Sequence, residues 1–148
     1  MIPDGVAGLR VLHLQSRSGA ESLALVEAGA TVIGIDRARS AVQAARALST
    51  ERGLAARFIE ADLYDARHSL PEPESFDLVY TDADVTALHD VGEWARIVAW
   101  FLKPGGRVTA GAQHPVTPEV AVALEQAGLT VDAAASPFSA VLRQPGQN

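Results

Sequence analysis

Runs of apolar residues alternate along the chain with segments whose small and apolar residues recur at helical spacing. The apolar runs are short and rich in aliphatic or β-branched residues, which is typical of strands buried in a sheet. These strands are expected in residues 10–15, 30–36, 56–65, 76–82 and 107–112, with two more in 129–144 around a bend at Ser136-Pro137. The helices are expected in residues 19–29, 38–53, 91–106 and 117–128.

Residues typical of helix ends support the predicted helices. Glycine follows three of them, as it does where a helix ends in a left-handed residue. These residues are Gly29, Gly53 and Gly128. Thr117 and Pro118 are suited to the N-cap and first turn of the last helix.

Two helices show an apolar face. The face expected in 38–53 consists of Ala41, Ala44, Ala45 and Leu48. The face expected in 91–106 consists of Trp94, Ile97, Val98, Phe101 and Leu102, with Pro104 and the two glycines after it ending the helix.

The alternation of strands and helices predicts an α/β fold. Right-handed crossovers would give a Rossmann-like, doubly wound and mostly parallel seven-stranded sheet, with helices on both faces and a C-terminal antiparallel hairpin. We expect one domain over residues 1–148, with its core in about 9–143. Ligands of such sheets bind beyond the carboxyl ends of the strands.

Composition narrows the function classes. The chain has 148 residues, of which 48% are hydrophobic and 20% charged, and its net charge of −6 argues against a nucleic-acid partner. Cysteine is absent, which excludes disulfides, thiolate catalysis and cysteine-based metal sites, and no metal site is expected. No signal-peptide pattern or bilayer-spanning stretch is present, so the expected location is cytoplasmic, without a membrane partner.

Candidate binding residues lie where three predicted strands end. Gly19 closes the polar stretch after the first strand, and Asp36 and Asp62 end the next two. A carboxylate can accept hydrogen bonds from a ribose diol or from an exocyclic amine. A single acid at a strand end is most often a helix cap, but two acids ending successive strands beside a glycine-closed loop favour a shared nucleotide site.

The first strand also carries polar residues. His13 and Gln15 alternate with Leu12 and Leu14, so one face of the strand tip is polar. Two interpretations of His13 remain open, a ligand-binding residue and a hydrogen-bonded histidine in the core.

From about Leu9 to Pro115 the chain resembles the class I S-adenosylmethionine-dependent methyltransferases that act on small molecules. VLHLQSRSG is similar to a first-strand motif that reads His-Leu-Gln-Cys in one branch, and VIGID, EADLYD, FDLVYTD and WARIVAWFLKPGGRV are similar to the later motifs. The resemblance implies S-adenosylmethionine as cofactor, with Asp36 at the ribose and Asp62 and Leu63 at the adenine. The cofactor-binding residues expected on this basis are His13, Gln15, Ser16, Gly19, Asp36, Arg37, Asp62, Leu63 and Thr81.

The sequence departs from that branch around the acceptor site. An acid-Gly-His-Pro motif and a long insertion are expected after the fifth strand, but the chain has GAQHP, with Ala112 and Gln113, and no insertion. Only about nine residues precede the first strand, so the helices that would close the site are missing. The open site suggests a homodimer or a partner protein. Trp100, on the polar side of its helix, would suit such an interface or would pack under the last hairpin.

Proton transfer would require a group near the fourth and fifth strand ends. His114 is the preferred candidate and Asp82 the second, while Asp84 and His89 are further candidates. The leading hypothesis is methyl transfer to a small-molecule acceptor. A catalytically silent domain that binds a partner remains the alternative. An NAD-dependent oxidoreductase is disfavoured because G-x-G-x-x-G is absent.

Overall fold

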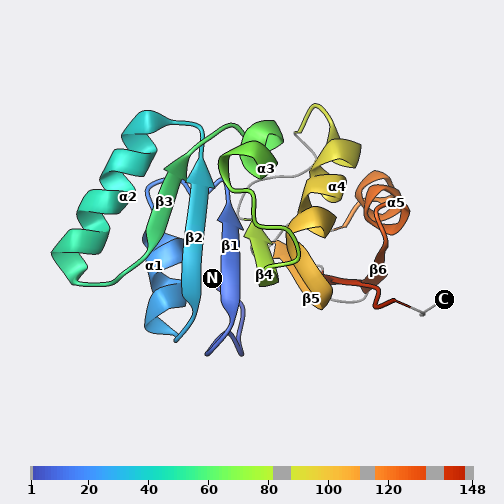
Figure 1. Cartoon of the computed structure of the whole chain (residues 1–148), viewed down its shortest axis with the longest axis horizontal. Helices are drawn as coiled ribbons and strands as arrows, with labels where there is room; N and C mark the ends of the chain where they lie inside the picture. The colour runs from blue at the N-terminus through green and yellow to red at the C-terminus, as the bar shows by residue number, and fades with distance from the viewer. Residues whose placement is uncertain (1, 82–87, 111–115, 133–138, 146–148) are drawn as a thin grey trace.

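The computed structural model describes residues 2–81, 88–110, 116–132 and 139–145. A seven-stranded sheet runs through its centre in the order β3-β2-β1-β4-β5-β7-β6 (Figure 1). The first five strands are parallel, and β7 pairs antiparallel with both β5 and β6, which confirms the predicted sheet and hairpin. The strands are β1 (Arg10–Leu14), β2 (Thr31–Asp36), β3 (Arg57–Glu60), β4 (Phe76–Thr81), β5 (Leu102–Ala110), β6 (Leu129–Asp132) and β7 (Ser139–Leu142).

Helices cover both faces of the sheet, as the sequence predicted (Figure 1). Alternate residues of β1 point to opposite faces, so Val11 packs with Leu25 of one helix layer while Leu12 packs with Trp94 of the other. The helices are α1 (Ala20–Glu27), α2 (Arg39–Arg52), α3 (Ala66–Ser69), α4 (Val91–Phe101) and α5 (Pro118–Gln126), with a 3₁₀ turn at Leu63–Asp65. The 3₁₀ turn occupies the end of the segment expected only as a strand and its exit, and α3 follows it in residues for which no helix was predicted.

The boundary between α4 and β5 differs from the prediction. The helix ends at Phe101, although Leu102 was expected on its apolar face and Pro104 at its end, and the strand expected from 107 begins at Leu102. The reason is strand pairing, because Leu102 lies opposite Phe76 in β4 and the next paired residue is Arg107 opposite Leu78. Lys103 to Gly106 therefore form an irregularity within the strand.

The buried face of α2 is shifted from the predicted one. Ala44 is exposed, whereas Val42 and Ala45 are buried and pack with Leu23 and Phe58. The three predicted glycine ends and the predicted N-cap of the last helix are confirmed. Gly29, Gly53 and Gly128 have φ of 101°, 64° and 102°, and Thr117 accepts a hydrogen bond from the Val120 amide.

Two general features of the described part of the chain bear on function. No helix in it has the length and apolar character that a membrane span requires. Nor do its histidines, aspartates and glutamates gather in groups of three or more that would hold a metal ion. The bend at Ser136-Pro137 lies outside the described residues.

Candidate cofactor site

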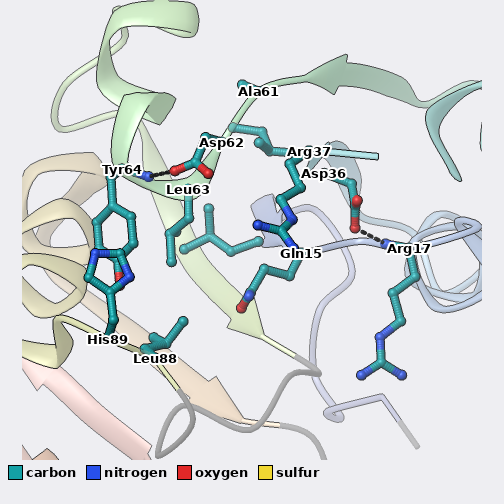
Figure 2. A pocket seen from close by; sticks show the side chains of 12 residues that line it. Gln15, Arg17, Asp36, Arg37, Ala61, Asp62, Leu63, Tyr64, Leu88 and His89 are labelled. Carbon is teal, nitrogen blue, oxygen red and sulfur yellow. Dashed lines mark hydrogen bonds between the residues drawn. The ribbon is translucent and has the colours of Figure 1, made fainter. Parts of the chain in front are cut away.

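A pocket of about 420 Å³ lies at the carboxyl ends of β1, β2 and β3 (Figure 2). The loops after these strands form most of its wall, and Leu88 and His89, which precede α4, complete it. Leu14, Ile35 and Leu63 supply an apolar surface, while Asp36 and Asp62 supply two carboxylates. This volume and this mixture of an apolar lining with a few polar groups are typical of small-molecule sites.

Asp36 connects the first two loops of the pocket. Its Oδ2 accepts a hydrogen bond from the Arg17 amide at 2.8 Å, and its Oδ1 accepts one from the Ala38 amide at 2.9 Å. A carboxylate has about four acceptor sites, so both oxygens retain a lone pair for a ligand. Asp36 is therefore both a structural tether and an available acceptor.

Asp62 lies on the opposite side of the pocket (Figure 2). Its Oδ1 accepts from the Tyr64 amide at 2.9 Å and caps the 3₁₀ turn. Its Oδ2 has no hydrogen-bond partner among the residues that the structure describes. The fold thus brings the acids of β2 and β3 to one pocket, as the sequence predicted, and their role in binding a ligand stays a prediction.

The loop after β1 keeps a backbone shape that usually requires glycine. Gln15 and Arg17 have φ of 56° and 54°, in the left-handed region, and both line the pocket. The Ser16 amide donates to the Ile35 carbonyl at 2.9 Å and the Gly19 amide to the Ser16 carbonyl at 3.1 Å, which holds the loop. A left-handed non-glycine residue costs about 1–2 kcal/mol, so the loop stores strain at two positions.

Gly19 lies where two helices and a strand pack closely. It precedes α1 with φ of 87° and does not line the pocket. A Cβ there would lie 2.7 Å from the Ala45 Cβ and 3.1 Å from the Phe58 Cζ. The glycine therefore permits close packing of α1 on α2. The expected approach of a cofactor to its backbone stays a prediction.

His13 lies in the core between β1 and α1, outside the pocket wall. Its Nδ1 is 2.6 Å from the Ser22 Oγ, and its ring contacts Tyr80 at 4.9 Å between centroids. Burial lowers the pKa of His13 to about 4, so the ring is neutral at pH 7. This placement agrees with the alternative interpretation of a core histidine.

Ser16 and Thr81 are also absent from the pocket wall. Both are buried, with exposed fractions of 4% and 0%. Ser16 points behind the loop, where a Cβ on Gly34 would lie 2.9 Å from its Oγ. Thr81 lies between Leu14 and Ala110 in the strand register. Direct contact with a ligand in this pocket is therefore not supported for either residue.

Arg37 and Leu63 line the pocket as expected, and the structure adds residues that the sequence did not single out as cofactor ligands. The rings of Tyr64 and His89 contact each other in a tilted arrangement at 4.5 Å between centroids, and the Asp90 amide donates to the Tyr64 hydroxyl at 3.2 Å. Tyr64 could have been inferred from its position beside Asp62. The pairing with His89 depends on the fold, because 24 residues separate them in the chain.

The proposed proton acceptors cannot be compared with this geometry. His114, Asp82 and Asp84 lie outside the described residues. His89 is described and exposed at the pocket wall.

Trp100 is half-buried, and its ring packs edge-on against Phe101 at 5.0 Å between centroids. Neither the proposed interface nor packing under the hairpin is tested by this contact.

The pocket residues fit an adenosyl cofactor. The two carboxylates offer acceptors to a ribose and an exocyclic amine, and the apolar side chains suit a purine ring. The Gln15 Oε1 is buried without a donor among the described residues, so a ligand can supply the missing hydrogen bond.

Residues 11–106, well over half of the chain, match the family model described as a methyltransferase domain. The chain belongs to the methyltransferase-domain family. This methyltransferase domain is 35% identical over 111 residues to a ubiquinone biosynthesis O-methyltransferase from Ralstonia nicotianae. The match covers 74% of the chain and 45% of that relative, so the chain spans less than half the length of the curated protein.

Solved structures agree with this methyltransferase-domain fold. A SAM-dependent methyltransferase from Aquifex aeolicus superposes with a TM-score of 0.75 at 18% identity, over 93% of this chain and 85% of that one. A structure reported for the conversion of a disulfide bond into a thioacetal group during echinomycin biosynthesis gives 0.79 at 18% identity, over 96% and 79%. At these identities the likeness concerns the fold alone.

Proposed function

We propose that the chain is an S-adenosylmethionine-dependent methyltransferase domain that transfers a methyl group to a small-molecule acceptor. The main support is the pair of carboxylates, Asp36 and Asp62, that line one pocket at the carboxyl edge of the parallel sheet. Membership of the methyltransferase-domain family supports the same function. The curated relatives are named ubiquinone biosynthesis O-methyltransferases, which favours a hydroxyl acceptor.

The chain's own residues have distinct tasks in this proposal. S-adenosylmethionine supplies a methyl group already activated on a sulfonium, so the protein mainly binds, aligns and excludes water. Asp36 accepts from the ribose hydroxyls and Asp62 from the adenine amine. Leu14 and Leu63 provide apolar contact for the base. His114 and Asp82 are the proposed proton acceptors for a hydroxyl acceptor.

Two parts of the proposal concern the surroundings of the site. A second copy of the chain or a partner protein would cover the acceptor, with Trp100 in the interface, and the location would be cytoplasmic. A catalytically silent domain is the second candidate. The observation that favours it is the loop after β1, where the non-glycine residues Gln15 and Arg17 occupy left-handed positions and line the pocket.

Isothermal titration calorimetry tests cofactor binding. Wild-type protein would be titrated with S-adenosylmethionine, S-adenosylhomocysteine and NAD, and the adenosyl compounds alone should bind. Asp62→Asn keeps an oxygen that can accept from the Tyr64 amide but removes the carboxylate, so we expect about tenfold weaker binding, or about 1.4 kcal/mol. Asp36→Ala is less specific because it also removes the acceptor of the Arg17 and Ala38 amides.

Glu60→Gln is the matched control. Glu60 ends β3 beside Asp36 in the register, pairs with Arg39, and lies outside the pocket wall. The Glu60→Gln variant should bind S-adenosylhomocysteine with the same affinity as the wild type. Absence of binding by any adenosyl compound, or equal effects of the two variants, would contradict the proposal. Turnover requires a separate assay of S-adenosylhomocysteine formation from candidate acceptors; binding without turnover favours the silent domain.

A further inference from the structure

Tyr64 connects a carboxylate of the pocket to the beginning of α4. Its amide donates to the Asp62 Oδ1 at 2.9 Å. At the far end of the side chain, the hydroxyl accepts from the Asp90 amide at 3.2 Å and donates to the Asp90 carbonyl at 3.4 Å. Between these two ends, the ring contacts that of His89 (Figure 2). Tyr64 is thus held at three points, and one of them is the carboxylate.

The anchor on α4 is itself fixed. Asp90 is the N-cap of that helix, and its Oδ1 accepts from the Glu93 amide at 2.9 Å. A second tie joins the same two segments, because Arg67 of α3 pairs with Glu93 at 2.6 Å. Arg67 and Glu93 lie outside the pocket wall. The two ties therefore differ in one respect, since only that of Tyr64 reaches Asp62.

The bond from the Tyr64 amide decides which oxygen of Asp62 is left for a ligand. Oδ1 is engaged, and Oδ2 has no hydrogen-bond partner among the residues that the structure describes. An ionised carboxylate accepts hydrogen bonds and donates none. Held in one orientation, Asp62 presents a single acceptor at a fixed place in the pocket wall.

A fixed acceptor discriminates between purines, and this step rests on the proposed function, in which Asp62 accepts from the adenine amine. A 6-oxo purine has an acceptor where adenine has its amine, so it would set two acceptors against each other. It also has a donor on the adjacent ring nitrogen, which a carboxylate that turns can reach. We propose that Tyr64 is a positioning residue that sets the preference of the pocket for a 6-amino over a 6-oxo purine, by holding Asp62 in one orientation.

The test compares two ligands by isothermal titration calorimetry. S-inosylhomocysteine differs from S-adenosylhomocysteine only in its 6-oxo group and the hydrogen on the adjacent ring nitrogen. Wild-type protein should bind the adenosyl compound at least about tenfold more tightly, as expected for a hydrogen bond to a charged acceptor. Tyr64→Phe keeps the ring but removes both hydroxyl bonds to Asp90. This ratio of affinities should then fall about threefold, mainly through weaker binding of S-adenosylhomocysteine.

Two further variants separate positioning from general packing. Arg67→Gln loosens the same two segments without a bond to Asp62, so the ratio should stay within about 1.5-fold of the wild type although the melting midpoint falls. Asp62→Asn removes the carboxylate through which Tyr64 acts. Adding Tyr64→Phe to Asp62→Asn should therefore not lower the ratio further. Melting midpoints of all variants report whether they are folded.

Four outcomes would overturn the inference. An unchanged ratio in Tyr64→Phe would mean that the hydroxyl positions nothing, and an equal fall in Arg67→Gln would assign the effect to packing of the two segments. A further fall in the double variant would show that Tyr64 acts independently of Asp62. Equal affinities of the wild type for both ligands would remove the preference itself, while leaving cofactor binding and the proposed function intact. Wild-type protein that binds neither ligand would instead refute the proposed function, and the inference with it.

Discussion

Gly19→Ala tests why the loop after β1 ends in glycine. An alanine Cβ would lie 2.7 Å from the Ala45 Cβ and 3.1 Å from the Phe58 Cζ, and it would have to adopt a φ of 87°. The left-handed conformation costs about 1–2 kcal/mol. Overpacking between α1 and α2 adds about 1–3 kcal/mol. The expected loss is about 3 kcal/mol, which lowers the thermal midpoint by roughly 6–12 °C in a chain of this size.

Gly53→Ala separates the two costs. Gly53 also has a left-handed φ, 64°, but a Cβ there would meet no atom within 4 Å. Its variant should therefore lose only about 1 kcal/mol, the conformational part. Calorimetric or circular-dichroism melting of both variants gives the difference that belongs to packing.

A double variant that combines Gly19→Ala with Ala45→Gly tests the packing cost independently. Removing the Ala45 methyl group gives the new Cβ room, so the combined variant should be at least about 1 kcal/mol more stable than the sum of the single effects predicts. If Gly19→Ala destabilises no more than Gly53→Ala, the packing explanation is wrong. A normal melting midpoint together with lost binding of S-adenosylhomocysteine would restore the interpretation that Gly19 makes room for the cofactor.

Three other perturbations have defined outcomes. Burial lowers the pKa of His13 from 6.5 to about 4, so the unfolded chain binds a proton here more readily than the folded protein does. The free energy of unfolding should therefore be unaffected by this group above pH 6.5 and fall by about 3 kcal/mol as the pH drops to 4. Urea unfolding at several pH values should show this decrease, and His13→Gln should remove it. Gln15→Gly should raise the melting midpoint by up to about 3 °C while weakening binding of S-adenosylhomocysteine; a lower midpoint would show that φ of 56° carries no strain. Thr117→Ala should cost about 1 kcal/mol in chemical denaturation by removing the cap of the Val120 amide, and an unchanged stability would mean that the cap is not needed.

Local residue patterns were sufficient for most of the fold. Strands that are buried on both faces are continuous apolar runs, and glycine and threonine mark helix ends through their own backbone and hydroxyl chemistry. The error at the boundary between α4 and β5 occurred where distant pairing decides the local structure. Leu102 continues the apolar stripe of α4, but its backbone pairs with Phe76, and this contact converts the residue to strand.

The candidate site was predictable where strand ends alone define it. Asp36 ends β2 and Asp62 follows β3, and parallel strands bring their carboxyl ends to one edge of the sheet. His13 was ambiguous because alternation along β1 places it on a face without saying whether a ligand or Ser22 occupies that face. The contacts of His13 with Ser22 and Tyr80 agree with the core interpretation.

The sequence by itself determined the order of elements, the parallel sheet and the two acids at its edge, because these depend on local periodicity and on residues adjacent in the chain. Only the tertiary structure decided that Gly19 packs against α2, that the ring of His89 contacts that of Tyr64, and that Gln15 holds an unsatisfied acceptor at the pocket. Those outcomes depend on distances between segments far apart in the chain, and short-range spacing contains no information about them.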